Sequence, residues 1–457
     1  MTRRSLRRVT RSCAILLALL LALFGAAGPA AAAGLSPAQV QAQQWWINRL
    51  SLREVWKISQ GQGVTVAVVD SGVDPHFDGP TGDLNGAVLR GYDVSTGGNG
   101  QHDTSSVQHG SHIADEIAGR GTGFGLLGVA RQAKILPVSI AGGASDSVVT
   151  ALQRLTATAD PPQVVNMSLG YQEQCSPRLQ QAVKAATAKG MILVAAAGNE
   201  GRAGNPSDSP ANCVGVVGVA AVEDADQPRA YADSNRQPYV SLSAPGVHMI
   251  GYDDQAASGY GYADGTSDAA AIVSGTFAVV RAHFPSESPR QIVTRVLNSA
   301  HQVQGADGTR NDTYGFGVAL PLYALTRSVP ADAPNPIYDA LAKLGTPSRS
   351  PTATASGPAS NTAAGPSTSP ASSHPAAAGS SGSGSDVGLI LGIVGGVVLI
   401  VLIVLIVVLR NRRRPSAAGP PWDGPGHGSE PWQGPAPGPG PWQDPGRGPW
   451  QGRGGGS

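Results

Sequence analysis

Short apolar runs alternate with amphipathic stretches over residues 34–327, and this pattern defines the part of the chain that we expect to fold. Five runs are rich in β-branched residues and have no polar face, which predicts strands buried on both sides of a parallel sheet. Amphipathic segments such as residues 178–189 supply helices between them, so the pattern is typical of an α/β fold with one large core. The predicted strands are residues 64–69, 134–140, 163–167, 192–196 and 214–219.

Two further apolar runs predict targeting and anchoring segments. Residues 1–33 carry five arginines, an apolar run and a stretch of small residues, which is typical of a cleavable secretory signal. An uncleaved anchor is the alternative, although the run is short for a membrane span. Residues 387–409 hold no charge and are long enough to cross a hydrocarbon core of about 30 Å as one helix. Arginines follow at once, so the positive-inside rule predicts an extracytoplasmic domain and a cytoplasmic tail at 410–457.

The segments on either side of this run have low-complexity composition. Residues 328–386 are mostly a flexible stalk rich in Pro, Ser, Thr, Ala and Gly, although 331–345 could instead form a short helix against the domain. The tail repeats a Pro-Trp unit, which fits either a ligand for a proline-recognition domain or a disordered segment whose indoles touch the membrane. Gly388, Gly392 and Gly396 predict close pairing of membrane helices in a homo-oligomer, unless they reflect only the frequency of glycine in such helices.

Charge and cysteine content narrow the partners and the compartment. The formal net charge is +1 and the arginine clusters belong to the two ends, so we expect no nucleic-acid partner. Loss of the signal removes Cys13 and leaves Cys175 and Cys213, an even number in an oxidising compartment. This predicts a disulfide worth about 4 kcal/mol in the chain-entropy model, with two free buried thiols as the alternative.

Three residues supply the parts of one nucleophilic device: Asp70 in VAVVDSGVD, His109 in HGSHIADEIAG and Ser267 in GTSDAAAIVSG. A serine hydroxyl is a poor nucleophile at neutral pH, so it needs a base within hydrogen-bond reach, and the base needs a carboxylate to hold its tautomer. Asp70 ends a predicted strand, while His109 and Ser267 begin helical stretches. Such positions meet at the carboxyl edge of a parallel sheet.

These motifs resemble those of the subtilisin-like serine proteases, or subtilases, in which Asp, His and Ser follow one another in the same order. VVNMSLG at 164–170 is similar to the substrate-binding strand of the family, and AAAGNEG at 195–201 to its oxyanion segment. The resemblance extends across about 250 residues of the chain. The resemblance implies a subtilisin-like parallel sheet flanked by helices, and a polypeptide substrate.

The resemblance also implies a role for each site residue. Asp70 would orient His109, His109 would act as general base, and Ser267 would attack the scissile carbonyl. The Asn199 amide and the Ser267 backbone N–H would donate to the oxyanion. For Asn199, a purely structural role in a turn is the alternative. The substrate backbone would pair with Ser168, Leu169 and Gly170.

The N-terminal side of the domain resembles a narrower group, the membrane-anchored mycosins associated with type VII secretion in actinobacteria. The similar segment is residues 43–74, and the order of signal, protease, Pro-rich stalk, membrane helix and basic end is similar too. The positions of Cys175 and Cys213 also look like the disulfide of that group. Because only 36 residues separate Ala33 from Asp70, residues 34–60 are expected to wrap the domain rather than form an independent prodomain. The resemblance implies a link to the type VII secretion machinery.

Two functions stay open at this point. One is an active membrane-anchored serine endopeptidase. The other is a scaffold partner of a secretion machine with weak or vestigial proteolysis, because Asp268 and Ala271 stand where the family usually has Met or Phe and then Pro. A carboxylate beside the oxyanion would oppose it by roughly 1 to 4 kcal/mol at about 4 Å, against the 8 to 23 kcal/mol that enzymes typically supply. Alternatively, Asp268 would only complement the dipole of the helix that Ser267 opens.

The sequence offers little to a metal ion or cofactor, and we expect none. The segment GRGTGFGLLGVA at 119–130 aligns with a calcium-binding region of secreted subtilisins but has almost no side-chain oxygens, whereas calcium needs six to eight oxygen ligands. Asp103, Asp115 and Glu116 lie near His109 in the chain. We expect them to be solvated surface carboxylates.

Overall fold

The computed structural model describes residues 34–140, 144–225, 227–303, 310–344 and 441–442. All of them belong to one of the two compact units into which the chain divides. The predicted signal at 1–33, most of the stalk, the apolar run at 387–409 with Gly388, Gly392 and Gly396, and most of the tail lie outside the described residues. No helix among the described residues has the length and apolar character of a membrane span.

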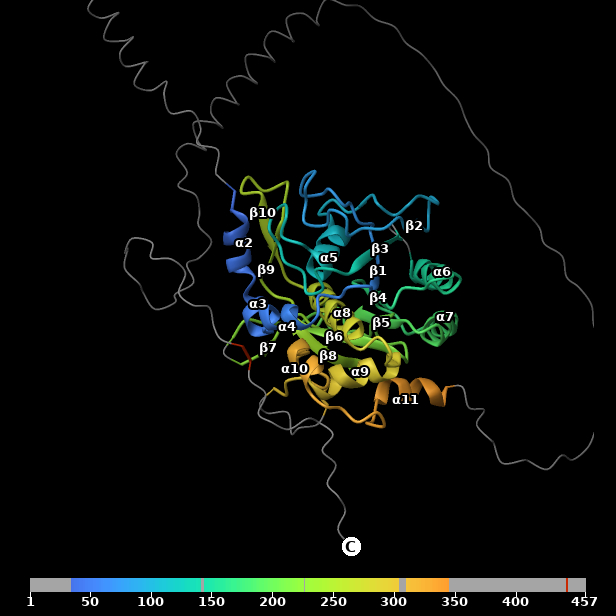
Figure 1. Ribbon diagram of the computed structural model, residues 1–457. Coiled ribbons are helices and arrows are strands. Elements are labelled where there is room, and N and C mark those ends of the chain that lie inside the picture. Colours follow the sequence, from blue (N-terminus) through green and yellow to red (C-terminus); the bar gives the residue numbers. More distant parts are fainter. Residues whose placement is uncertain (1–33, 141–143, 226, 304–309, 345–440, 443–457) are drawn as a thin grey trace, which may run out of the picture. The chain divides into compact units, whose positions relative to one another are not determined.

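The centre of this unit is an eight-stranded sheet in the order β2-β3-β1-β4-β5-β6-β7, with β8 also paired with β6 (Figure 1). Its ladders are parallel except for the short β6–β7 pair, which confirms the α/β class. The five predicted strands are all present, with small differences at their ends. Their bounds are β1 (Thr65–Asp70), β3 (Lys134–Ser139), β4 (Val164–Met167), β5 (Ile192–Ala196) and β6 (Val216–Glu223).

The remaining strands have no counterpart among the predictions. β8 (Val240–Pro245) is buried at every position, but its sequence alternates apolar residues with serines and lacks the continuous apolar run. β2 (Tyr92–Asp93) and β7 (Arg229–Ala230) are two residues each. β9 (Met249–Tyr252) and β10 (Tyr260–Ala263) pair antiparallel in a separate hairpin.

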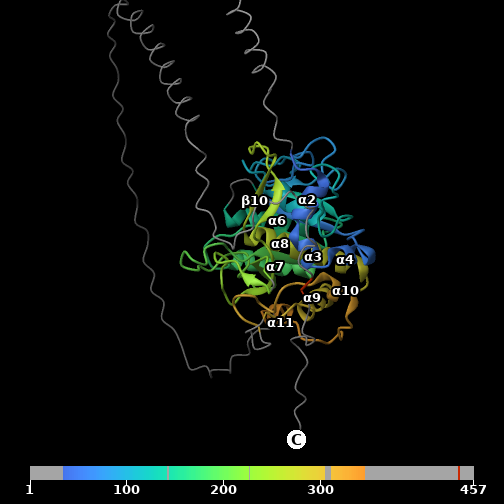
Figure 2. The same ribbon diagram turned by 90° about the vertical axis from the view of Figure 1, so that its left-hand side faces the viewer.

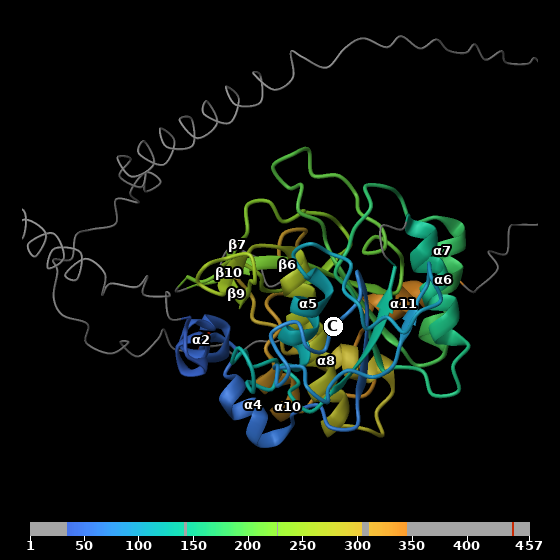
Figure 3. The ribbon, with the colours of Figure 1, turned by 90° about the horizontal axis from the view of Figure 1, so that it is seen from above.

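Helices cover both faces of the sheet, which Figure 3 shows from above. Successive side chains of a strand point to opposite faces. Val66 and Val68 of β1 therefore pack with α5 (His109–Ala118) and α8 (Thr266–His283), while Ala67 and Val69 pack with α6 (Ser145–Thr156) and α7 (Pro177–Ala188). Helix α7 matches the predicted helix at 178–189 and starts with Pro177 after the Ser176 cap, whose hydroxyl accepts from the Leu179 N–H.

The helix that carries Ser267 is the most deeply buried of these. Every residue of α8 from Thr266 to Val280 except Ser267 is buried. Small side chains make this possible: a Cβ on Gly275 would come within 2.6 Å of the Val129 Cβ. The start of α8 is therefore held firmly against the sheet, which fixes the position of Ser267.

Residues 34–60 wrap the domain as expected, in three short helices that Figure 2 shows side by side: α2 (Pro37–Gln43), α3 (Trp45–Arg49) and α4 (Leu52–Ile58). The indole N–H groups of Trp45 and Trp56 donate to the carbonyls of Val247 and Val129 at 3.1 and 3.0 Å. Buried Gln44 exchanges two hydrogen bonds with the backbone of Leu127. These contacts tie the segment to the domain along its whole length.

The C-terminal side of the domain adds α9 (Pro289–Asn298), α10 (Pro321–Thr326) and α11 (Pro336–Lys343). For residues 331–345 the structure has the helix rather than the stalk, because Arg290 of α9 pairs with Asp339 at 2.9 Å and Ile337 is buried in the core. The Arg290 carbonyl also accepts from the Asn335 amide. The folded unit therefore continues past Arg327.

Trp442, from the predicted cytoplasmic tail, also contacts this unit. Its side chain is only 4% exposed, and its backbone and indole N–H groups donate to the carbonyls of Arg49 and Ala225, both at 3.2 Å. The Arg49 guanidinium lies 5.6 Å from the centre of the indole. Trp442 cannot contact this unit and also belong to a tail on the other side of a membrane from it.

Cys175 and Cys213 are joined in a disulfide, with Cα atoms 5.1 Å apart. Cys175 precedes α7 and Cys213 precedes β6, so the bond ties a loop on the carboxyl side of β4 to the start of the strand two positions along the sheet. The free-thiol alternative does not describe this structure.

Candidate active site

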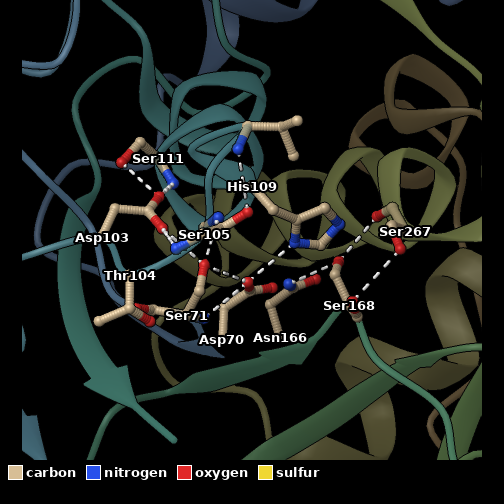
Figure 4. Close-up of polar contacts among 12 residues, drawn as sticks. Asp70, Ser71, Asp103, Thr104, Ser105, His109, Ser111, Asn166, Ser168 and Ser267 are labelled. Atoms are coloured by element: carbon tan, nitrogen blue, oxygen red, sulfur yellow. Dashed lines mark hydrogen bonds and ion pairs between the residues drawn. The ribbon is translucent and has the colours of Figure 1, made fainter. Parts of the chain in front are cut away.

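The structure brings Asp70, His109 and Ser267 together at the carboxyl edge of the sheet (Figure 4). Asp70 is the last residue of β1, His109 is the first residue of α5, and Ser267 is the second residue of α8. Asp70 is 6% exposed, and one of its carboxylate oxygens contacts the His109 Nδ1 at 2.8 Å. The same oxygen accepts from the Ser71 N–H at 2.7 Å. A carboxylate at this distance favours the tautomer with the proton on Nδ1, which leaves Nε2 free to accept one.

The environment of His109 strengthens its affinity for a proton. Burial lowers the pKa of His109, but the charge of Asp70 and its hydrogen bond outweigh burial, and Asp268 and Asp103 add to them, so that the pKa rises to about 9. An imidazole must be neutral to accept a proton from serine. A reaction that depends on His109 as base should therefore run faster as the pH rises toward this value.

The Ser267 hydroxyl donates to the Ser168 carbonyl at 3.2 Å, and the Ser168 hydroxyl donates back to the Ser267 carbonyl at 2.8 Å. Asn166 holds Ser168 in turn, through an amide donor at 2.9 Å. This exchange joins the end of β4 to the start of α8 (Figure 4). For attack, the Ser267 side chain must turn from that carbonyl toward Nε2 of His109.

Asn199 is held by its amide oxygen, which accepts from the N–H and the hydroxyl of Thr266 at 2.9 and 3.0 Å. Its own N–H donates to the Glu200 carboxylate at 2.9 Å. With the oxygen fixed against the first turn of α8, the amide NH₂ is the end left to meet a ligand. It lies in the same cleft as Ser267.

Asp103 fastens the loop after β1 to the start of α5. Its carboxylate accepts from the hydroxyls of Ser71 and Ser111, both at 2.7 Å, and from the Ser111 N–H at 2.8 Å (Figure 4). The Ser71 hydroxyl accepts from the Gly110 N–H at 3.1 Å. Asp103 therefore steadies both residues of the Asp70–His109 pair through their chain neighbours.

The expectation that Asp103, Asp115 and Glu116 are solvated surface carboxylates was wrong. Asp103 is partly buried and hydrogen-bonded as described above, and Asp115 and Glu116 are 1% and 4% exposed. The reason is that α5 packs against both the sheet and α8, so that little of its surface faces solvent. Burial raises the pKa values of Asp115 and Glu116 well above their ordinary range.

These residues open onto a cleft of about 510 Å³. One wall carries His109, Asn199, Ser267 and Asp268, and the hairpin β9–β10 supplies the other. The sequence prediction did not include the hairpin; the only signal was the short alternation Tyr-Gly-Tyr-Ala at 260–263. A cleft of this size and depth can hold an extended peptide against the nucleophile.

The predicted substrate-binding segment lies beside this cleft rather than in its lining. Ser168 is buried and bonds to Ser267, Leu169 is partly buried and Gly170 is exposed beyond the end of β4. Among the described residues, no three His, Cys, Asp or Glu side chains are grouped to hold a metal ion. The chemistry available in the cleft is that of a hydroxyl, an imidazole, carboxyl groups and an amide.

Comparison with known proteins gives this geometry a family context. The family model described as "Subtilase family" matches residues 61–317. An extracellular protease of Xanthomonas campestris pv. campestris is 32% identical over 302 residues, which cover 56% of this chain and 50% of that protein. Subtilisin Savinase of Lederbergia lenta is 32% identical over 283 residues, with 61% of this chain and 97% of that protein covered.

A solved structure with a similar fold is described as MycP1 from the ESX-1 type VII secretion system. It has a TM-score of 0.53 and 26% sequence identity, and the match covers 64% of this chain and 88% of that one. The chain thus spans half the length of the Xanthomonas relative and most of the length of the smaller ones.

Proposed function

Because the chain belongs to the subtilase family, we propose that it is a serine endopeptidase that hydrolyses peptide bonds through an acyl-enzyme. The observation that carries the proposal is the 2.8 Å contact between Asp70 and His109 in the cleft that Ser267 lines. The relatives named as proteases support the same reaction class.

In the proposed reaction the Ser267 Oγ attacks the scissile carbonyl carbon while its proton passes to Nε2 of His109. Asp70 stabilises the imidazolium that forms. The carbonyl oxygen becomes an oxyanion and receives hydrogen bonds from the Asn199 amide and the Ser267 backbone N–H, at the positive end of α8. His109 then protonates the leaving amine, and water repeats the sequence on the acyl-enzyme to regenerate Ser267.

Substrate positioning is the part of the proposal that rests on the segment after β4. We expect an extended peptide to align its backbone with Ser168, Leu169 and Gly170, as in strand addition. This mode uses backbone hydrogen bonds, so it gives affinity with little selectivity for side chains. The hairpin β9–β10 across the cleft is better placed to discriminate between them.

Covalent labelling by a fluorophosphonate tests the proposal directly. The wild-type protein should react at Ser267, and the Ser267→Ala variant should not. Ser286→Ala, at an exposed position after α8, is the matched control and should react like the wild type. Absence of Ser267-dependent labelling in a folded wild-type protein would contradict the proposal.

The cellular setting that we propose is a single-pass membrane protein with its protease domain outside the cytoplasm, linked to type VII secretion. The uncharged run at 387–409 and the arginines after it support the anchor. The similarity to MycP1, described as part of the ESX-1 type VII secretion system, supports the link.

The contact of Trp442 with Arg49 and Ala225 argues against this topology. Reporter fusions after residue 457 decide between the anchored topology and the Trp442 contact. A reporter active only in the cytoplasm is expected for the anchored topology, and one active only outside the cytoplasm would favour the Trp442 contact.

A second candidate function is a scaffold for a secretion machine with weak proteolysis, and Asp268 beside the nucleophile is the observation that favours it. A strain that carries Ser267→Ala separates the two functions. Loss of export in that strain is expected for the endopeptidase. Normal export, with the variant present at wild-type level, would favour the scaffold.

A further inference from the structure

Two buried carboxyl groups meet where the helices of the candidate base and nucleophile pack together. Glu116 of α5 is 4% exposed and Asp268 of α8 is 8% exposed, and their side chains are hydrogen-bonded to each other. A carboxylate only accepts hydrogen bonds, so a bond between two carboxyl groups requires a proton on one of them. The pair must therefore carry at least one proton.

The surroundings decide which of the two holds the proton. Glu116 is 4% exposed between α5 and α8, and among the described residues no N–H or hydroxyl group donates to its Oε2, so an anion there would be poorly solvated. Asp268 lies in the first turn of α8, receives its own backbone N–H, and lines the cleft. The positive end of the helix dipole favours the anion at Asp268. Glu116 is thus the acid and Asp268 the carboxylate.

Asp268 is close enough to the reacting groups to matter. A Cβ built on Gly265 would lie 3.2 Å from one Asp268 carboxylate oxygen and 3.5 Å from the Asn199 amide nitrogen, so both groups border the same small space. Its charge also acts on His109, since it contributes to the raised pKa of that imidazole. A hydrogen bond from Glu116 draws the Asp268 carboxylate toward the interface of α5 and α8.

We propose that Glu116 is a positioning residue of the proposed protease: its protonated carboxyl group donates a hydrogen bond to the Asp268 carboxylate, and the pair determines the negative charge next to His109 and the oxyanion. This inference rests on the proposed function, because it assumes that His109 is the base. It explains how an aspartate can follow the nucleophile directly: the Asp268 carboxylate is held by Glu116, and its charge keeps His109 protonated up to a higher pH.

Other charged groups face the same residues and act on them in known directions. Asp264, just before α8, and Asp115, next to Glu116 on α5, disfavour a further negative charge on the pair. Asp70 and Asp103 favour the His109 cation together with Asp268. His112 is partly buried near His109, and desolvation together with the charge of His109 lowers the pKa of His112.

The pH dependence of kcat/KM for peptide hydrolysis tests the pair. Asp268→Asn removes the charge and should move the acid limb to lower pH by on the order of one unit. Glu116→Leu removes the donor, which keeps Asp268 protonated to higher pH, and should move the limb the same way. Glu116→Gln still donates to Asp268 and should leave the limb near its wild-type position. Asp332→Asn, an exposed charge change outside the cleft, is the control.

A purely structural role would lower activity in these variants without moving the limb. Equal limbs in the wild type, Asp268→Asn and Glu116→Leu, or a Glu116→Gln profile that follows Glu116→Leu, would overturn the proposal. The titration of His109 followed by NMR in the Ser267→Ala background measures the same shifts without turnover. A shift of His109 in Asp268→Asn with no hydrolysis by the wild type would support the pair and reject the proposed function.

Discussion

Two pairs of titratable side chains flank the candidate nucleophile, Asp70 with His109 and Glu116 with Asp268, and they differ in the donors that each offers to a negative charge. Asp70 contacts the His109 Nδ1 and accepts from the Ser71 N–H, while the Ser71 hydroxyl donates its one proton to Asp103 at 2.7 Å. Two N–H donors are therefore available to a carboxylate at Asp70. The partner of Glu116 is Asp268, another carboxyl group. Among the described residues, each pair also has one carboxyl oxygen without a donor, Asp70 Oδ2 and Glu116 Oε2. Asp70, Glu116 and Asp268 are buried and His109 is partly exposed, and both pairs join α5 to another element. Burial alone therefore does not set the charge of a carboxyl group, because the hydrogen-bond donors around it also matter.

The largest expected effect comes from the first pair. Asp70→Asn keeps the shape of the side chain but offers His109 an amide, which favours the wrong tautomer. We expect kcat to fall by about 10⁴-fold, as is typical of such a change. Steady-state peptide hydrolysis measures it, with thermal unfolding as the control for folding. A loss of less than tenfold would mean that Asp70 does not orient the base.

The second largest effect is expected at the oxyanion donor, Asn199, because its amide counteracts the negative charge of the nearby Glu116–Asp268 pair. Asn199→Ala removes the amide and should lower kcat by about 10²- to 10³-fold, with KM nearly unchanged. Burst-phase kinetics with an ester substrate would report this loss on acylation. A rise in KM with constant kcat would contradict this role. Asn199 would then bind the substrate or serve only in the turn.

The second pair also has a signature in stability. The pKa of Glu116 is raised in the folded protein, so the folded state binds its proton more tightly than the unfolded state does. Its contribution to stability is then present below the ordinary pKa of a glutamate and is lost as the pH rises through the folded value.

In the Glu116→Gln variant the free energy of unfolding should therefore fall less steeply as the pH rises, by up to about 1.4 kcal/mol per pH unit. Urea denaturation at a series of pH values measures this slope. Part of the slope should remain in the variant because the pKa of Asp115 is also raised. An unchanged slope would show that Glu116 does not carry a proton in the folded state.

Much of the sheet could be predicted because its inner strands are continuous apolar runs, which need no knowledge of the fold to interpret. β8 was missed because its buried serines break that pattern, and β9–β10 because a hairpin of four-residue strands leaves almost no periodic signal. The hairpin nevertheless forms one wall of the cleft. Short elements whose burial depends on tertiary contacts are beyond what local patterns record.

The candidate site also has a part that the sequence predicts and a part that it does not. Asp70, His109, Ser267 and Asn199 stand in motifs whose chemistry can be inferred residue by residue, and the structure collects them at one sheet edge. Asp268 could be identified as a departure, but its partner could not, because Glu116 looks like a surface residue until α8 covers that face of α5. Which carboxyl groups meet is decided by helix packing between distant segments.

The most direct test of the account compares both pairs in one measurement, the rate at which a fluorophosphonate labels Ser267 at a single alkaline pH. The account predicts that Asp70→Asn slows labelling by about 10⁴-fold. Asp268→Asn should stay within about tenfold of the wild type, since only a nearby charge changes. Equal losses in the two variants, or a larger loss in Asp268→Asn, would contradict the account.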